Sequence, residues 1–133
     1  MTEPATRHRG LLDTSIFIAQ ETGRAVGELP DLAAISVVTI AELHLGVLMT
    51  DDPESRAHRL RTLSEVESLF EPLPIDPMVA RSFAELVAQA RRQGRRPKIM
   101  DTWIAATAAA HDLVLYTQDE DFLSFSQIQV IRV

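Results

Sequence analysis

Four acidic residues of this 133-residue chain lie where apolar segments end or where helices are expected to begin. Asp13 follows the apolar pair of LLDTSIFI, Glu42 interrupts AISVVTIAELHLGVLM, Asp101 opens DTWIAATAAAH, and Asp119 closes LVLYTQD. Carboxylates in apolar surroundings are costly to desolvate, and a divalent cation often compensates them. Several carboxylates in one crevice would also repel one another unless a cation neutralised them. We therefore expect these four residues to share one metal site.

The type of ligand indicates which ion and which reaction to expect. Sites made only of oxygen ligands favour Mg²⁺, for which Mn²⁺ can substitute. Such an ion activates a bound water, orients a phosphate and stabilises the charge that builds up on a phosphodiester during in-line attack. That chemistry is typical of a nuclease. The chain has no cysteine, which excludes thiolate catalysis and cysteine-based zinc sites, and we assign none of its four histidines to the site.

Each acid also has an ordinary structural explanation. Asp13 and Asp101 could cap helices, a frequent role of aspartate. Glu42 could complete a capping box with Thr39, and Asp119 could be a turn residue. Each of these explanations accounts for one residue, whereas a shared metal site accounts for all four positions.

Strands and helices alternate along the chain and would position the acids at one edge of a sheet. Strands are predicted to end near Asp13 and to occupy 32–38, 113–117 and 128–133, with helices beginning after Asp13, near Thr39, at Pro53, at Pro77 and at Asp101. This alternation predicts an α/β fold with a mainly parallel sheet flanked by helices, as one domain over residues 1–133. Ligands of such sheets bind beyond the carboxyl ends of the strands. We expect Asp13 and Asp119 at those ends, with Glu42 and Asp101 in first helical turns that face the same crevice.

The ordered set of motifs resembles a known family. LLDTSIFI, SVVTIAELHLG, IMDTWIAATAAAHDLVLYTQDEDF and a closing hydrophobic strand are together similar to the PIN-domain ribonucleases, and among them to the VapC-type toxins of VapBC toxin–antitoxin pairs. Each motif alone is common, but the ordered set spans nearly the whole chain. The resemblance implies a PIN domain, a three-layer α/β/α fold, acting as a Mg²⁺-dependent endoribonuclease toxin that cleaves RNA by metal-activated water.

The resemblance also implies roles for individual residues. The catalytic and metal-binding quartet falls on Asp13, Glu42, Asp101 and Asp119. Asp13 and Asp101 would be the main metal ligands, Glu42 would bind directly or through water, and Asp119 would bind a second ion or position water. Thr14 and Thr117 follow the family's pattern of hydroxyls beside the quartet. Asp121 remains an alternative fourth acid, because the family varies in spacing at QDEDF; we favour Asp119, which follows the predicted strand.

The charge distribution limits how RNA could be bound. With 13 basic and 19 acidic residues the formal net charge is −6, so the whole molecule does not attract polyanions and any contact must be local or assisted by metal. The one dense basic run, RRQGRRPK at 91–98, leads to Asp101. Its first two arginines suit a helix C-terminus. We predict that Arg95, Arg96 and Lys98 bind RNA phosphates, since clustered basic residues supply most nucleic-acid affinity.

Partners and location follow partly from the resemblance, which implies a cognate antitoxin and a homodimer. The longest apolar stretch, 32–49, is interrupted by polar residues, so we expect no membrane span. The N-terminus lacks the apolar core of a secretory signal, and a cytoplasmic protein is expected. Two other functions remain open: a receiver-like phosphoacceptor domain, although no late strand ends in the lysine it would need, and a catalytically inactive PIN-like binding module.

Overall fold

The centre of the molecule is a parallel sheet, seen in a computed structural model that describes residues 9–133. Its strands are β1 (Arg9–Leu12), β2 (Leu32–Ala34), β3 (Val114–Thr117) and β4 (Val130–Arg132). They lie in the order β2–β1–β3–β4, and each neighbouring pair is parallel. The predicted parallel sheet is thus confirmed, with strands shorter than expected. The first eight residues of the predicted domain, and with them the expectation about an N-terminal signal, lie outside the described part.

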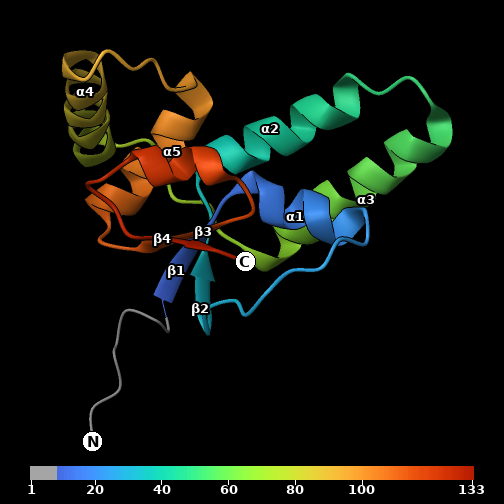
Figure 1. Ribbon diagram of the computed structural model, residues 1–133. Helices are drawn as coiled ribbons and strands as arrows, with labels where there is room; N and C mark the ends of the chain where they lie inside the picture. Colours follow the sequence, from blue (N-terminus) through green and yellow to red (C-terminus); the bar gives the residue numbers. More distant parts are fainter. Residues whose placement is uncertain (1–8) are drawn as a thin grey trace, which may run out of the picture.

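Helices cover both faces of the sheet and make three layers (Figure 1). They are α1 (Thr14–Glu21), α2 (Val37–Leu48), α3 (Pro53–Leu69), α4 (Pro77–Arg92) and α5 (Ile99–Ala110), with a short 3₁₀ helix, η2 (Glu120–Ser124), that the sequence did not predict. Leu11 and Leu115 pack with α4 and α5 on one face. Leu12 and Tyr116, their neighbours in the strands, pack with α1 and α3 on the other. This alternation confirms the α/β/α architecture. No helix within residues 9–133 is long and apolar enough to cross a membrane.

The start of α2 corrects one prediction. The second strand ends at Ala34 and not at residue 38, and the helix begins at Val37 and not near Thr39. Ser36 is the N-cap, because its hydroxyl accepts a hydrogen bond of 3.0 Å from the backbone N–H of Val38. The proposed capping box is therefore wrong, and Glu42 lies in the second turn of the helix. A serine three residues earlier takes the capping role that Thr39 was expected to have, by accepting from one N–H of the first turn.

Helix α5 also begins earlier than predicted, at Ile99 in place of Asp101. Lys98 occupies the N-cap position without a side-chain cap, and its carbonyl accepts a hydrogen bond of 2.8 Å from the Thr102 hydroxyl. Asp101 is therefore the third residue of the helix. It lies in the first turn, as expected, but it does not cap the helix, so the capping explanation for this acid is wrong.

The end of α4 is fixed by a glycine in the left-handed conformation. The helix was predicted to run to Gly94; it ends at Arg92, and Gly94 follows with φ of 70°. The N–H of Gly94 donates to the carbonyl of Arg91 at 3.0 Å, and the N–H of Arg95 donates to the carbonyl of Ala90 at 2.8 Å. These are the two bonds of a Schellman motif, which sets the direction of the basic loop between α4 and α5.

Two glycine-to-alanine variants should change stability in opposite directions. Gly94→Ala should lower the free energy of unfolding by about 1 kcal/mol, because a residue with a Cβ is strained at positive φ. Gly46→Ala, inside α2, should raise it by roughly 0.5–1 kcal/mol, since the new Cβ would meet only the guanidinium of Arg59, at 3.6 Å. Urea unfolding followed by Trp103 fluorescence measures both. Equal effects of the two variants would contradict the helix end described above.

Candidate metal centre

One cleft, of about 620 Å³, is lined by Asp13, Glu42, Asp101 and Asp119 together. Asp13 lies between β1 and α1, Glu42 on α2, Asp101 on α5, and Asp119 after β3. Parallel strands end at the same edge of a sheet, and this brings residues from four separate parts of the chain to one place. The structure thus gathers the four acids that the sequence singled out.

The carboxylate of Asp13 is hydrogen-bonded by other side chains and does not cap helix α1. It occupies the N-cap position of α1, but its carboxylate makes no cap hydrogen bond. The hydroxyl of Ser15 donates to Asp13 Oδ1 at 2.6 Å, and Asp13 is only 4% exposed. Burial raises the pKa of Asp13 to about 6, while hydrogen bonds from Ser15 and Thr117 act in the opposite direction and the charge of Asp101 adds to the rise. Its proton is therefore held unusually tightly.

Ser15 is a site residue that the sequence reasoning missed. Besides bonding Asp13, its Oγ accepts a hydrogen bond of 2.9 Å from the N–H of Gln118 and lies 3.3 Å from Thr117 Oγ1. This single hydroxyl therefore ties the start of α1 to the end of β3. The only signal in the sequence was its position two residues after Asp13 in D-T-S, which does not reveal the contact with a strand about a hundred residues later.

Glu42 is oriented by a threonine on a different helix. The hydroxyl of Thr14, the first residue of α1, donates to Glu42 Oε1 at 2.6 Å. Thr14 Oγ1 also lies 3.1 Å from the Oγ1 of Thr39, a fully buried residue one turn before Glu42. Thr39, expected to begin α2 as a cap, therefore supports the hydroxyl that orients Glu42.

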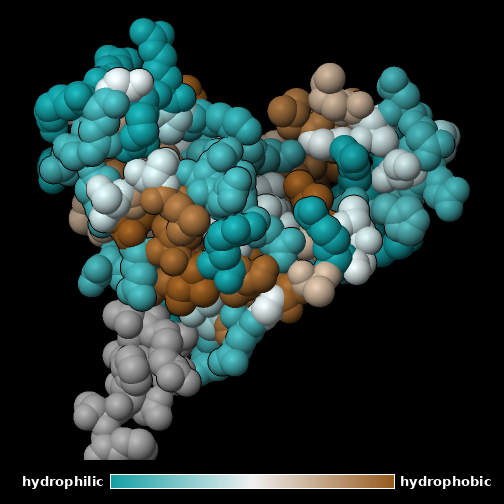
Figure 2. Space-filling model, viewed as in Figure 1, coloured by the Kyte–Doolittle hydropathy of each residue, from teal (hydrophilic) through white to brown (hydrophobic). Residues whose placement is uncertain are grey.

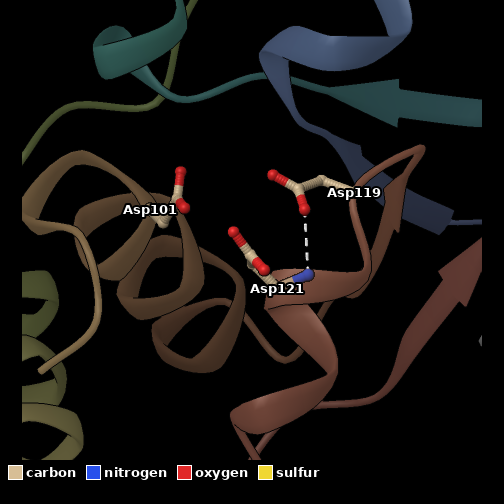
Figure 3. Close-up of side chains that lie close together, drawn as sticks. All are labelled: Asp101, Asp119 and Asp121. Carbon is tan, nitrogen blue, oxygen red and sulfur yellow. Dashed lines mark hydrogen bonds between the residues drawn. The ribbon is translucent and has the colours of Figure 1, made fainter. Parts of the chain in front are cut away.

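Asp101, Asp119 and Asp121 form the tightest acidic group in residues 9–133, with one carboxylate oxygen of each within 4.8 Å of the others. Figure 3 shows their carboxylates pointing toward one another from α5, the turn after β3 and the start of η2. The N–H of Asp121 donates to Asp119 Oδ1 at 2.9 Å, so Asp119 also has the turn role considered for it. Asp13 and Glu42 line the same cleft outside this tight group.

The pKa of Asp101 is shifted by burial and by the negative charges close to it. Burial raises its pKa to about 6, the charges of Asp119, Glu42 and Asp121 add to the rise, and Lys98 opposes it. A cation among these groups would remove the repulsion. The donors are carboxylate and hydroxyl oxygens, which suit a hard cation such as Mg²⁺ or Mn²⁺ and not a soft metal. The residues present therefore fit the ion that the sequence predicted.

The predicted RNA-binding residues lie next to the acids. Arg95, Arg96 and Lys98 line a hollow of about 580 Å³ together with Asp101 and Asp121. Lys98 Nζ lies 4.0 Å from Asp121 Oδ2, and both side chains are well exposed. Such a pair contributes little to stability, so Lys98 remains available to a ligand. Asp101 borders both this hollow and the cleft.

Comparison with known proteins gives matches over almost the whole chain. The sequence pattern of the PIN domain matches residues 10–128. Ribonuclease VapC5 of Mycobacterium tuberculosis is 45% identical over 137 residues, covering 99% of this chain and 98% of the relative. Ribonuclease VapC4 of the same organism is 43% identical over 130 residues, covering 94% of this chain and 97% of the relative.

A solved structure agrees with the sequence matches. The crystal structure of VapBC-5 from Mycobacterium tuberculosis, a member of the VapBC family of toxin–antitoxin systems, matches with a TM-score of 0.86 and 44% identity. The match covers 95% of this chain and 99% of the chain in that structure. Sequence and fold are therefore similar over the same residues.

The raised pKa of Asp13 predicts how the metal-free protein responds to pH. Its value is 3.8 without perturbation and about 6 in the folded chain, so folded protein binds the extra proton and loses stability as pH rises through this window. Asp13→Asn should abolish that loss. At pH 7 in EDTA the variant should be more stable than the parent by roughly 3 kcal/mol, at about 1.4 kcal/mol per pKa unit. The difference should vanish at about pH 4, near the unperturbed pKa of the acid.

Urea unfolding at both pH values measures this effect, and Asp52→Asn is the control. Hydrogen bonds from Ser55 lower the pKa of Asp52, so replacing this exposed acid should not stabilise the protein at pH 7. An Asp13→Asn variant that lost stability at pH 7 would show that the carboxylate is compensated without metal.

Proposed function

This chain belongs to the PIN-domain family and to its VapC branch, and on that basis we propose that it is a metal-dependent endoribonuclease and the toxin of a toxin–antitoxin pair. The observation that carries the proposal is the convergence of Asp13, Glu42, Asp101 and Asp119 on one cleft. A chain that only resembled the family in fold would have no reason to keep four mutually repelling carboxylates at that place.

We infer that the quartet holds Mg²⁺, with Mn²⁺ able to substitute. Asp13 and Asp101 are the main ligands, Glu42 binds directly or through water, and Asp119 binds a second ion or positions water. The ion, when bound, lowers the pKa of a water and neutralises charge on the phosphodiester that is cut. No side chain then needs to act as the nucleophile.

The chain's own hydroxyls keep the ligands in place. Ser15, at 2.6 Å, fixes the rotamer of Asp13, and Thr14, also at 2.6 Å, fixes that of Glu42. Thr117 Oγ1 accepts a hydrogen bond of 2.9 Å from the N–H of Asp119 and so positions the turn that carries it. Partners of this kind around metal ligands affect both ligand orientation and metal affinity.

The substrate and the partners follow from the same reasoning. Arg95, Arg96 and Lys98 lie where they can bind the phosphates of an RNA strand at the acid group. We propose a cognate antitoxin as the protein partner, as in the VapBC-5 complex, together with a homodimer acting in the cytoplasm. An antitoxin could block the site by placing an arginine among the carboxylates, where a charge-assisted pair would compete with the metal.

The two alternative functions are not equally compatible with these findings. A receiver-like phosphoacceptor is set aside because the chain belongs to another family. A PIN-like module without catalysis would share the fold and the partner, so a cleavage assay separates it from the proposed enzyme.

Loss of a principal ligand should abolish cleavage and leave the fold intact. Asp13→Asn and Asp101→Asn should reduce RNA cleavage in Mg²⁺ by at least about 100-fold, because an amide does not supply the charge that holds the cation. Asp51→Asn, a change in an exposed residue outside the cleft, should cut RNA like the parent. Mg²⁺ should raise the melting temperature of the parent and of Asp51→Asn, but not of the two ligand variants.

Expression in cells provides the second readout of the same prediction. The parent should arrest growth and create new RNA 5′ ends, and Asp101→Asn should do neither. An Asp101→Asn variant that cleaved RNA at the parental rate would refute the assignment.

Asp119 and Asp121 can be separated by the same assay. Asp119 lines the cleft with the other three acids, whereas Asp121 is exposed, pairs with Lys98 and does not line the cleft. We therefore expect Asp119→Asn to reduce cleavage far more than Asp121→Asn, whose cost should stay near the roughly tenfold that is typical of a neighbour to a metal ligand. The opposite order would make Asp121 the fourth acid.

A further inference from the structure

A second basic hollow, of about 670 Å³, lies between the end of α4 and the start of α5. We call it the α4–α5 pocket and define it by three arginines, Arg91, Arg95 and Arg96, and three apolar residues, Val87, Pro97 and Ile99. In Figure 1 the chain crosses here from α4 to α5, and the surface over α4 is hydrophilic in Figure 2. Its volume is in the range of about 300–1,000 Å³ that holds small organic ligands.

The α4–α5 pocket shares lining residues with the hollow and the cleft that contain the acids. Arg95, Arg96 and Pro97 also line the hollow that contains Asp101 and Asp121. Ile99 also lines the cleft of the quartet. The pocket therefore lies within the same group of residues that borders the acids.

The arginines of the pocket are free to bind an anion. Within residues 9–133 no ion pair involves Arg91, Arg95 or Arg96. The guanidinium of Arg95 is already oriented, because its Nε and Nη2 donate to Gln93 Oε1 at 3.0 and 2.6 Å. The helix end at Gly94 fixes its backbone. An oriented guanidinium with unused N–H groups loses little entropy when it binds a phosphate.

The combination of free arginines and an apolar lining favours one class of ligand. A phosphate alone needs only the arginines, and an apolar side chain needs only Val87, Pro97 and Ile99. A nucleotide uses both, because its phosphate pairs with arginine and its base packs on apolar groups or on a guanidinium plane. In an RNA strand, moreover, every phosphodiester has neighbours on either side, so a strand cut at the acids must place another nucleotide nearby.

We propose that the α4–α5 pocket binds one nucleotide of the RNA strand beside the bond that is cut. The inference rests on the proposed ribonuclease function and extends it, since it assigns a recognition role to Arg91 and Val87. Neither residue belongs to the set of Arg95, Arg96 and Lys98 that was placed next to the acids.

Binding of RNA without cleavage tests the pocket. The full chain with Asp13→Asn, in Mg²⁺, is titrated into a fluorescein-labelled, single-stranded RNA of mixed sequence, and anisotropy is followed at several salt concentrations. Adding Arg91→Ala and Arg95→Ala should weaken binding at least about tenfold. The slope of log K against log salt should fall by about 1.4, because each phosphate of a single strand that the protein no longer neutralises lowers it by about 0.7.

Matched controls separate the pocket from general charge. Arg24→Ala with Arg81→Ala removes two exposed arginines outside the pocket and should leave affinity and slope nearly unchanged. Val87→Ser should weaken binding of the RNA but not of an abasic oligomer of the same length, because only the RNA carries a base to pack there. Far-ultraviolet circular dichroism and Trp103 fluorescence check that each variant is folded.

The outcomes distinguish this inference from the function on which it rests. Equal affinities of the pocket variant and its control would overturn the pocket while cleavage by the parent still supported the enzyme. Unchanged RNA binding with loss of antitoxin co-purification would also overturn it, and would assign the surface to the protein partner. Arginine-dependent RNA binding by a parent that cleaves no RNA would support the pocket and refute the enzyme.

Discussion

Burial of carboxylates close to one another at one edge of the sheet is the constraint on which this site depends. Asp13 is almost completely buried, and both Asp13 and Asp101 have pKa values raised to about 6. Folding therefore works against electrostatics at this place, and a cation is the simplest means of relieving the cost. We propose that the same imbalance gives the cleft affinity for a hard ion.

Neutral hydroxyl groups orient two of the acids without neutralising the negative charge of their carboxylates. Ser15 and Thr117 hydrogen-bond Asp13, and Thr14 hydrogen-bonds Glu42, so two acids are oriented by groups that do not pair with them as cations would. A salt bridge at either position would occupy the carboxylate and compete with the metal. The contacts also join α1 to β3 and to α2, which means that the packing of the fold and the geometry of the acids depend on the same residues.

Positive charge is concentrated on one side of the acids. The chain is acidic overall, with a formal net charge of −6, yet the loop 93–98 and the last turn of α4 carry a dense basic run. We propose that this local reversal allows a polyanion to approach the cleft along the loop, although the negative charge of the molecule as a whole repels it. The Schellman motif at Gly94 directs the loop toward Asp101, so a backbone feature decides where the charges lie.

Sequence by itself determined much of this description. Apolar segments ending in acids predicted the parallel α/β fold, the quartet and the adjacent basic loop, because strand and helix periodicities are local properties of the chain. The starts of two helices were predicted less accurately. Helices α2 and α5 were expected to begin near Thr39 and at Asp101, but their N-cap residues are Ser36 and Lys98. The role of Ser15, the tight approach of Asp121 to Asp101, and the shared borders of the three hollows were decided only by tertiary structure. Each of these features depends on which segments, far apart in the sequence, are brought side by side by the packing of the sheet. A local pattern of residues does not specify such contacts.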